Sequence, residues 1–301
     1  MSNGVSEFMA ENGVLQIYPN NPRIPSWVMG FENWKDRQTR PNDIKDVTGS
    51  GANTVLTLEG QVRYGVKCKP GANENIERDH SKNLARGWSD TPDDWVSIEQ
   101  TGFIEITEQG ENHDIQWFGP SGRHPRVRTP PGGCMGSTYK GFLHSKNGKN
   151  RMAKEYYHVN YAFKGSNWEE GPEIAVDTIK QMNESGKKVG FKWVNMKIGD
   201  KRRVEIWVDI GGAIVDGEKP VNKWQLIRIR EDNSDWWPPK IENGGMDKCK
   251  CDKKKQVILW GAPTCVYRWD NQTGKLSLAT VQEITPPIQF HEKGDIITAP
   301  S

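Results

Sequence analysis

Hydrophobic and polar residues alternate along most of the chain after residue 50. Alternation with a period of two is typical of β-strands that bury one of their two faces. In the longest such segment, Ile104 and Ile106 fall on one face and Phe103 falls on the other. The pattern predicts about a dozen short strands, over residues 54–58, 61–66, 95–107, 112–118, 139–144, 152–158, 189–198, 203–210, 224–230, 257–260, 265–269 and 276–284.

Turns of characteristic composition separate these strands. Glu59-Gly60 predicts a hairpin-like break between the first two strands, and Asn147-Gly148 predicts a hairpin between residues 139–144 and 152–158. The segment 119–138 is rich in Gly and Pro and basic, and 231–255 is a polar insertion. Loops of this length inside a compact domain are usually functional or disordered.

One helix is expected, over residues 172–185. Ala175, Ile179 and Met182 recur there at the spacing of a single helix face, and Gly186 follows as a stop. Residues 1–50 show little periodicity and many turn formers. We therefore expect an irregular N-terminal arm over 1–50, with one strand around residues 14–18, and a single β domain over 51–301.

The composition agrees with this all-β reading. The chain contains 22 Ile and 20 Val but only 9 Leu and 11 Ala, together with 31 Gly and 18 Pro. Val and Ile suit strands, whereas Leu and Ala favour helices. A helical bundle is thereby excluded, and the predicted fold class is an antiparallel β-sandwich of the jelly-roll type with one short helix and long loops.

Charge and hydropathy exclude two classes of partner. The formal net charge is +2, which gives no support to nucleic-acid binding through bulk charge. No stretch approaches the roughly 18 apolar residues of a membrane span. The N-terminal residues lack the basic and apolar regions of a signal peptide, and the five cysteines cannot all pair within the chain. Localisation stays open, with an extracellular or surface position favoured.

The densest group of chemically active residues lies between 123 and 161. Cations and phenols of this kind could bind a uronic acid: an Arg or Lys neutralises the carboxylate, and a Tyr or His removes the C5 proton in a β-elimination. The expected catalytic residues are His158, Tyr156, Tyr139, Arg126 and Lys140, and the expected substrate contacts are Arg123, His124, Arg128, Lys154 and Tyr161. An ordinary solvated basic strand is the alternative.

A second pattern is the strand Glu205-Ile206-Trp207-Val208-Asp209. Period two places both carboxylates and the indole on one face, which suggests a glycosidase pair with a stacking aromatic. The alternative is a half-exposed strand that ends in a turn.

The 13 tryptophans are a third signal, because indole rings stack on pyranose faces. Trp193 and Trp260 lie in apolar strands and are expected in the core. Trp236 and Trp237 lie in a polar loop and, with Trp207, are the expected sugar contacts.

No cofactor is expected. The chain has no P-loop, dinucleotide-binding glycine motif, nucleophile elbow or HExxH motif. Cys249 and Cys251 supply only two of the four ligands that a structural zinc requires. A structural calcium ion and the oligomeric state are left open.

Two stretches resemble a known group of proteins. The first reads GCMGSTYKG at residues 133–141, followed by AKEYYH at 153–158 and Tyr161. The second reads LWGAP at 259–263, followed by YRWDN at 267–271 and VQEI at 281–284. Together with GFK at 190–192 and the 205–209 strand, they resemble microbial proteins with a concanavalin A-like lectin/glucanase fold, over residues 95–285. This resemblance implies a bent jelly roll similar in scaffold to alginate and glucuronan lyases.

The chain departs from the motifs of those lyases. The RSE(L/V)R, Q(I/V)H and YFKAG(V/N)Y strands are absent as such, and only 123–128 and 139–141 echo the first and third. The resulting hypothesis is a protein that cleaves or binds an acidic polysaccharide in a concave, cationic and aromatic groove. A non-catalytic carbohydrate-binding or attachment protein is the alternative, and the glycosidase built on Glu205 and Asp209 is a third.

Overall fold

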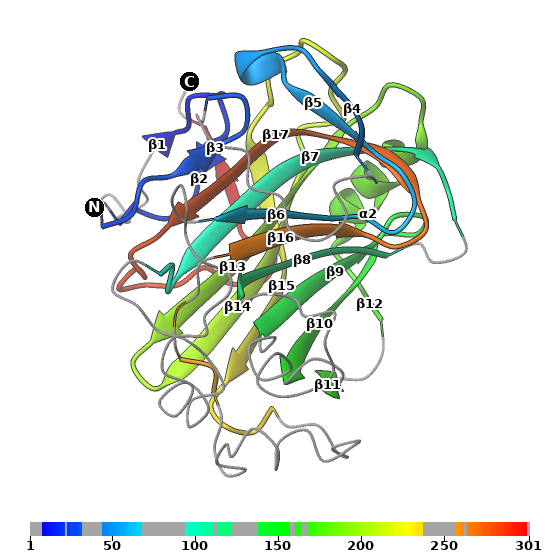
Figure 1. Cartoon of the computed structure of the whole chain (residues 1–301). Coiled ribbons are helices and arrows are strands. Elements are labelled where there is room, and N and C mark those ends of the chain that lie inside the picture. The colour runs from blue at the N-terminus through cyan, green and yellow to red at the C-terminus, as the bar shows by residue number, and fades with distance from the viewer. Residues whose placement is uncertain are drawn as a thin grey trace, which may run out of the picture.

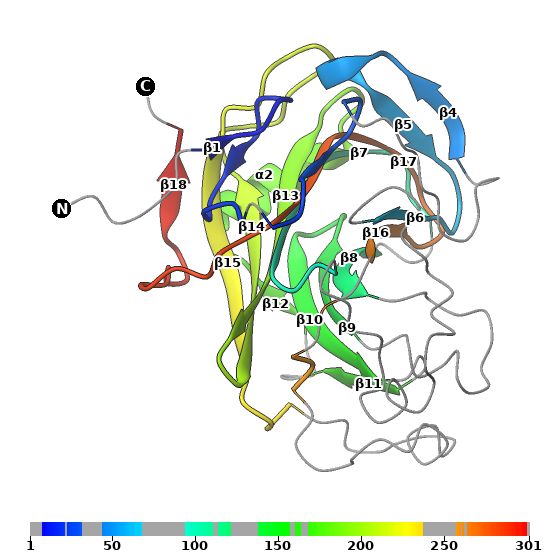
Figure 2. The same cartoon turned by 60° about the vertical axis from the view of Figure 1, so that its left-hand side comes forward.

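The chain folds into two stacked antiparallel β-sheets in the computed structural model (Figures 1 and 2). The structure describes residues 8–21, 23–31, 44–67, 94–110, 114–121, 138–156, 160–163, 168–236, 257–259, 261 and 264–299. The predicted fold class, an all-β antiparallel sandwich with one short helix, is confirmed for these residues.

The larger sheet has nine strands and the smaller has seven. In order across it, the nine-stranded sheet contains β18 (Ile296–Thr298), β15 (Lys223–Asp232), β14 (Lys201–Asp209), β13 (Val189–Ile198), β7 (Ile98–Glu108), β17 (Thr273–Glu283), β5 (Val55–Leu58) and β4 (Ile44–Thr48), with β3 (Trp27–Val28) beside β17. The seven-stranded sheet contains β11 (Asn160–Phe163), β10 (Lys149–Tyr156), β9 (Thr138–His144), β8 (Asp114–Ser121), β16 (Thr264–Trp269) and β6 (Arg63–Lys67), with β12 (Glu169–Glu170) beside β10.

The connection at Glu59-Gly60 corrects one expectation. Residues 55–58 and 63–67 form strands as predicted, but β5 belongs to the nine-stranded sheet and β6 to the seven-stranded sheet. The segment between them therefore crosses from one layer to the other instead of forming a hairpin. The hairpin predicted at Asn147-Gly148 is confirmed, because β9 and β10 pair on either side of it.

The two sheets bury a common core between their inner faces. Ile104 and Ile106 of β7 belong to this core, whereas Phe103 lies on the opposite, outer face of the nine-stranded sheet, as the alternation predicted. Side chains also bond across the layers. Gln100 donates to the carbonyl of Val266, and the Tyr267 hydroxyl donates to the carbonyl of Thr101.

The predicted helix is present but shorter than expected. Helix α2 spans Glu173–Lys180, and a 3-10 turn, η4 (Gln181–Asn183), continues it. Ala175, Ile179 and Met182 are all fully buried in the core, so the helical spacing identified the buried face correctly.

The N-terminal residues are more ordered than the sequence suggested. A hairpin of β1 (Phe8–Met9) and β2 (Leu15–Gln16) precedes β3, and β4 follows. Residues 14–18 form an arm segment that packs on the outer face of the nine-stranded sheet, where Val14, Leu15, Ile17 and Tyr18 are buried. Figure 2 shows β1 and β18 on this same side of the molecule.

Buried charges hold the arm segment in place. The amides of Ile17 and Tyr18 donate to the carboxylate of Glu99 at 3.0–3.1 Å. Lys192 pairs with Glu99 at 2.6 Å and also donates to the carbonyl of Leu15. Burial lowers the pKa of Lys192, and Glu99 opposes that shift. The sheet therefore binds the arm through one fully buried ion pair.

None of the helices in the described part of the chain is both long and apolar enough to cross a membrane.

Glu99→Gln should destabilise the fold strongly. The substitution leaves Lys192 buried without its counter-charge and weakens the bonds to two arm amides, which corresponds to a loss of about 3–5 kcal/mol in unfolding free energy. Urea denaturation measures this value. Glu11→Gln, at an exposed position of the same arm, is the matched control and should stay within about 0.5 kcal/mol of the parent. Equal stability of both variants would contradict the anchoring role of Glu99.

Candidate functional site

The outer face of the seven-stranded sheet carries a row of side chains in register. Arg63 on β6 lies opposite Arg268 on β16, and Arg268 lies opposite Gln116 on β8. Gln116 lies opposite Phe142 on β9, and Phe142 lies opposite Arg151 on β10. Neighbouring strands are about 4.8 Å apart, so this row, called here the arginine row, extends roughly 19 Å across the sheet.

The alternation of each strand explains why this row points outward. Tyr64, Trp117, Leu143, Met152 and Tyr267 each adjoin a member of the row and belong to the core between the sheets. Successive side chains on a strand face opposite sides. The core residues therefore fix the row on the face turned away from the nine-stranded sheet.

Arg151 is positioned by aromatic rings and a carboxylate. Its guanidinium carbon lies 4.7 Å from the Phe142 ring centroid and 4.2 Å from that of Trp168. One of its nitrogens donates to Asp114 at 3.0 Å. Trp168 in turn meets His144 edge to face at 5.4 Å. Contacts of this kind hold a guanidinium in one orientation, which reduces the entropy lost when it binds an anion.

Asp270 organises the other end of the row. It accepts a hydrogen bond from Arg268 at 2.8 Å and another from the Gln116 amide. Asp114 lies beside it on the same face, and burial, opposed by Arg151, raises the pKa of the Asp114 carboxyl. Asp270 adds to that rise. The face therefore combines cations, acids and aromatic rings on adjacent strands.

Lys140 lies on this outer face as well, but it is enclosed. Its ammonium is 4.4 Å from the Phe118 ring centroid and 2.5 Å from a Glu155 carboxylate oxygen, and the side chains of Lys140 and Glu155 have no exposed area. Glu155 already balances the charge that was expected to hold a substrate carboxylate. The predicted catalytic role of Lys140, which was to hold the substrate carboxylate, does not fit this placement.

Tyr139 and Lys154 point the other way, into the space between the sheets. The Tyr139 hydroxyl donates to Asp232 at 2.6 Å and accepts from the Ile258 amide at 3.1 Å, and Lys154 pairs with the same aspartate. Burial, followed by the charge of Asp232, raises the pKa of Tyr139 well above its usual range. A phenol held in this way is a structural donor, and it cannot act as a base at neutral pH.

Two of the predicted sugar-binding tryptophans are core residues. Trp236 is 1% exposed and packs on Tyr139, with ring centroids 5.5 Å apart. Trp207 is fully buried on the opposite outer face of the molecule, where its indole donates to Glu205 at 2.9 Å. The polar sequence around Trp236 had indicated exposure, but the residue belongs to the core between the sheets. Trp193 is buried, as expected.

The carboxylates of the glycosidase hypothesis are also buried and bonded. Glu205 accepts from the Tyr18 hydroxyl at 2.6 Å and from the Arg203 guanidinium at 2.6 Å. Asp209 accepts the amides of Gly211, Asn222 and Lys223 at 2.9–3.0 Å. Glu205 therefore anchors the arm segment, and Asp209 closes the turn after β14. This corrects the glycosidase reading.

The remaining predicted residues cannot be placed in the same way. Arg123, His124, Arg126, Arg128, His158 and Trp237 lie outside the described residues, and so do Trp260 and four of the five cysteines. Tyr156 and Tyr161 are described only as strand positions in β10 and β11. The described residues thus divide the predicted cluster between the inner and outer faces.

Sequence reasoning missed the arginine row because its members come from five separate strands. Arg63 and Arg268 are 205 positions apart, and only the strand register makes them neighbours. The alternation of each strand indicates which positions share a face, but the sheet order that aligns these positions is not visible in a single sequence. Within the described part of the chain, no three His, Cys, Asp or Glu side chains are grouped closely enough to share a metal ion.

Tyr139→Phe tests the structural role of this phenol. The substitution leaves the Ile258 amide without its buried acceptor and removes one donor from Asp232, at a cost of about 1–3 kcal/mol in unfolding free energy. Thermal or urea unfolding should show the loss, while retention on any polysaccharide that binds the parent should be unchanged. Unaltered stability together with lost retention would place Tyr139 in the binding site instead.

Comparisons with known proteins assign no family to the chain. No family model and no curated protein matches it. Among solved structures it is similar to the carbohydrate-binding module CBM66 from Bacillus subtilis, with a TM-score of 0.34, 9% identity and coverage of 79% of this chain and 91% of that one. It is also similar to peanut lectin, with a TM-score of 0.33, 12% identity and coverage of 87% and 99%, and to lectin II from Ulex europaeus, with a TM-score of 0.33, 7% identity and coverage of 86% and 97%. Likenesses with TM-scores this low support no conclusion about the ligand of this protein.

Proposed function

We propose that this protein binds an extended acidic polysaccharide across the outer face of its seven-stranded sheet. The observation that carries the proposal is the arginine row, Arg63, Arg268, Gln116, Phe142 and Arg151, in register over five strands. A polymer lying across the strands would meet the partly exposed guanidinium groups of Arg268 and Arg151, which stand three strand spacings or roughly 14 Å apart, over the buried Gln116 and Phe142.

The chemistry of the row suits a polymer of uronic acids. Guanidinium groups form paired, charge-assisted hydrogen bonds with carboxylates, and aromatic rings such as that of Trp168 suit the apolar faces of sugars. Arg151 and Arg268 have side chains that are 24% and 12% exposed. Both guanidinium groups are therefore partly accessible to a ligand, while hydrogen bonds to Asp114 and Asp270 hold them in place.

The partners of the row leave guanidinium surface for an anion. Arg151 pairs with Asp114 and Arg268 pairs with Asp270, yet both arginine side chains stay partly exposed. A substrate carboxylate could therefore bond the exposed part of each guanidinium group. Residues 123–128, which were expected to bind the same kind of carboxylate, lie outside the described residues.

Binding, without cleavage, is the function that the described residues support best. Tyr139 was expected to act in the β-elimination and Lys154 to contact the substrate, but both are bonded to Asp232 inside the sandwich. Cleavage would depend on Arg126, Tyr156 and His158, whose side chains lie outside the described residues. A lyase activity would appear as a rise in absorbance near 235 nm when the protein is incubated with alginate or glucuronan.

Arg151→Met should weaken binding to alginate or glucuronan by about tenfold or more. The substitution keeps the aliphatic stem between Phe142 and Trp168 but removes a charged hydrogen bond worth about 1.5–3 kcal/mol. Affinity electrophoresis or calorimetry at low and moderate salt measures the change, and binding by the parent should weaken as salt rises.

Lys180→Met, at an exposed position of α2, is the matched control and should bind like the parent. Dextran, which carries no charge, should bind more weakly than the acidic polymers. The proposal fails if the two variants lose affinity equally, or if the parent retains no acidic polysaccharide at low salt.

A further inference from the structure

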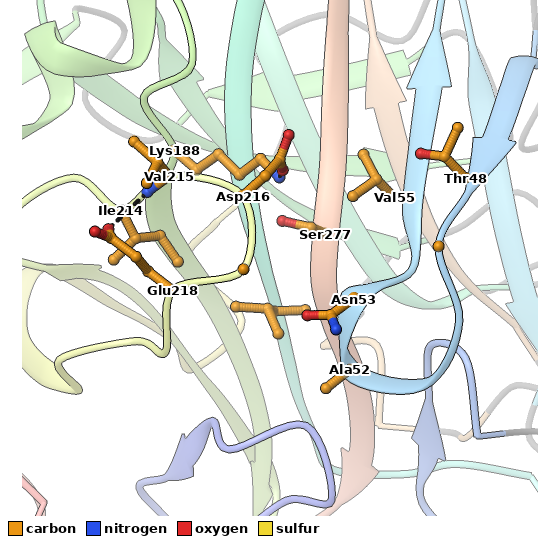
Figure 3. Close-up of a pocket in the computed structure, with 13 residues that line it drawn as sticks. Thr48, Ala52, Asn53, Val55, Lys188, Ile214, Val215, Asp216, Glu218 and Ser277 are labelled. Atoms are coloured by element: carbon orange, nitrogen blue, oxygen red, sulfur yellow. Dashed lines mark hydrogen bonds and ion pairs between the residues drawn. The ribbon is translucent and has the colours of Figure 1, made fainter.

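A separate cleft lies on the other side of the molecule, at the outer face of the nine-stranded sheet. Its volume is about 340 Å³, which falls within the usual range for small-molecule sites. Four segments form it: the end of β4 with the loop to the start of β5, Lys188 just before β13, the segment between β14 and β15, and the middle of β17 (Figure 3). Its walls include Ala52, Asn53, Val55, Ile214, Asp216 and Ser277.

The buried hydroxyl of Ser277 is the feature of the cleft that points most directly to a ligand. It lies on β17 between the Asp216 side of the cleft and the Asn53 side (Figure 3). The residue is 4% exposed, yet its hydroxyl has no hydrogen-bond partner among the described residues. Burying a hydroxyl without a partner costs free energy, so each such group in a native protein calls for an explanation, of which a bound ligand is one. A ligand hydroxyl in the cleft would supply that partner.

The backbone around Ser277 departs from regular strand geometry where β17 lines the cleft. The register between β17 and β7 shifts between Ser277 and Thr280, and Leu278 has a φ of 49°. Leucine rarely adopts this left-handed conformation, and both bulges and such strained residues concentrate at binding sites. The bulge places the Leu278 side chain and the Ser277 hydroxyl in the lining of the same cleft.

The charges that line the cleft disfavour an anionic ligand. Lys188 has a side chain that is 3% exposed and is paired with Asp216, and this hydrogen bond lowers the pKa of Asp216. Glu218 accepts the Val215 amide at 2.9 Å and adds a second negative charge. Lys275 also lies 4.0 Å from Asp216, but it is paired with Glu105 at 3.0 Å. Two cations therefore stand among three carboxylates. The ligand must bring hydroxyl groups without a negative charge.

We infer that this cleft is a second binding site, which takes a single neutral sugar residue. An apolar surface formed by Val55, Ile214 and Leu278 would receive one face of the ring. The Ser277 hydroxyl, the Asn53 amide and the Asp216 carboxylate would bond its hydroxyl groups. The inference does not rest on the proposed function, because the arginine row belongs to the other sheet.

The test uses the full chain labelled with nitrogen-15. D-glucose, D-galactose, D-mannose and N-acetyl-D-glucosamine are titrated separately, and amide shifts of Asn53, Asp216 and Gly217 are followed by NMR. At least one neutral sugar should produce saturable shifts confined to the cleft. D-glucuronate should bind more weakly than D-glucose, because of the two carboxylates. Absence of saturable shifts with all four sugars, or tighter binding of glucuronate, would overturn the inference.

Two variants separate a ligand site from a merely structural feature. Ser277→Ala should weaken sugar binding at least fivefold while the melting temperature stays the same or rises, because the lost hydroxyl had no partner. Ala52→Trp should fill the cleft and weaken binding at least tenfold. Ser50→Trp, an exposed neighbour outside the lining, should bind within twofold of the parent. Unchanged affinity in Ser277→Ala and Ala52→Trp would refute the site.

Discussion

The buried ion pair between Glu99 and Lys192 is the interaction on which much of the structure depends. It lies on the outer face of the nine-stranded sheet, where a β-sandwich usually meets solvent. Two fully buried charges at such a place are costly unless their remaining bonding capacity is used. The main chain of the arm segment uses it, through the amides of Ile17 and Tyr18 and the carbonyl of Leu15. Without the arm, Glu99 and Lys192 would lose these hydrogen bonds, so the sheet depends on the segment that covers it.

Asp232 plays a comparable part between the sheets. It joins Tyr139 and Lys154 of the seven-stranded sheet to β15 of the nine-stranded sheet. The cations and phenols that make the segment 139–158 look catalytic are thus used in part to connect the layers. The proposed binding face depends instead on partly exposed residues of the same sheet, such as Arg151 on β10 and Arg268 on β16.

Local pattern was enough to predict most strands, the helix and its buried face. Residues 189–198 form β13 with the expected bounds, and Ile104 and Ile106 face the core as predicted. Contacts between distant segments were not predictable in the same way. Trp207 and Glu205 do share a face, but only the docking of Tyr18 shows that the face is buried. The arginine row likewise depends on sheet order, which the alternation of single strands does not encode.

Anchoring of the arm has a consequence for how the chain is made. Residues 15–18 are synthesised before the groups that receive them, which lie at positions 99, 192 and 205. Contacts of such long sequence separation form slowly, because a long loop must close before the contacts lower the free energy. During synthesis the arm therefore cannot dock until the strand that carries Glu205 has emerged. The sheet beneath the arm must also wait for β17, which pairs with both β5 and β7.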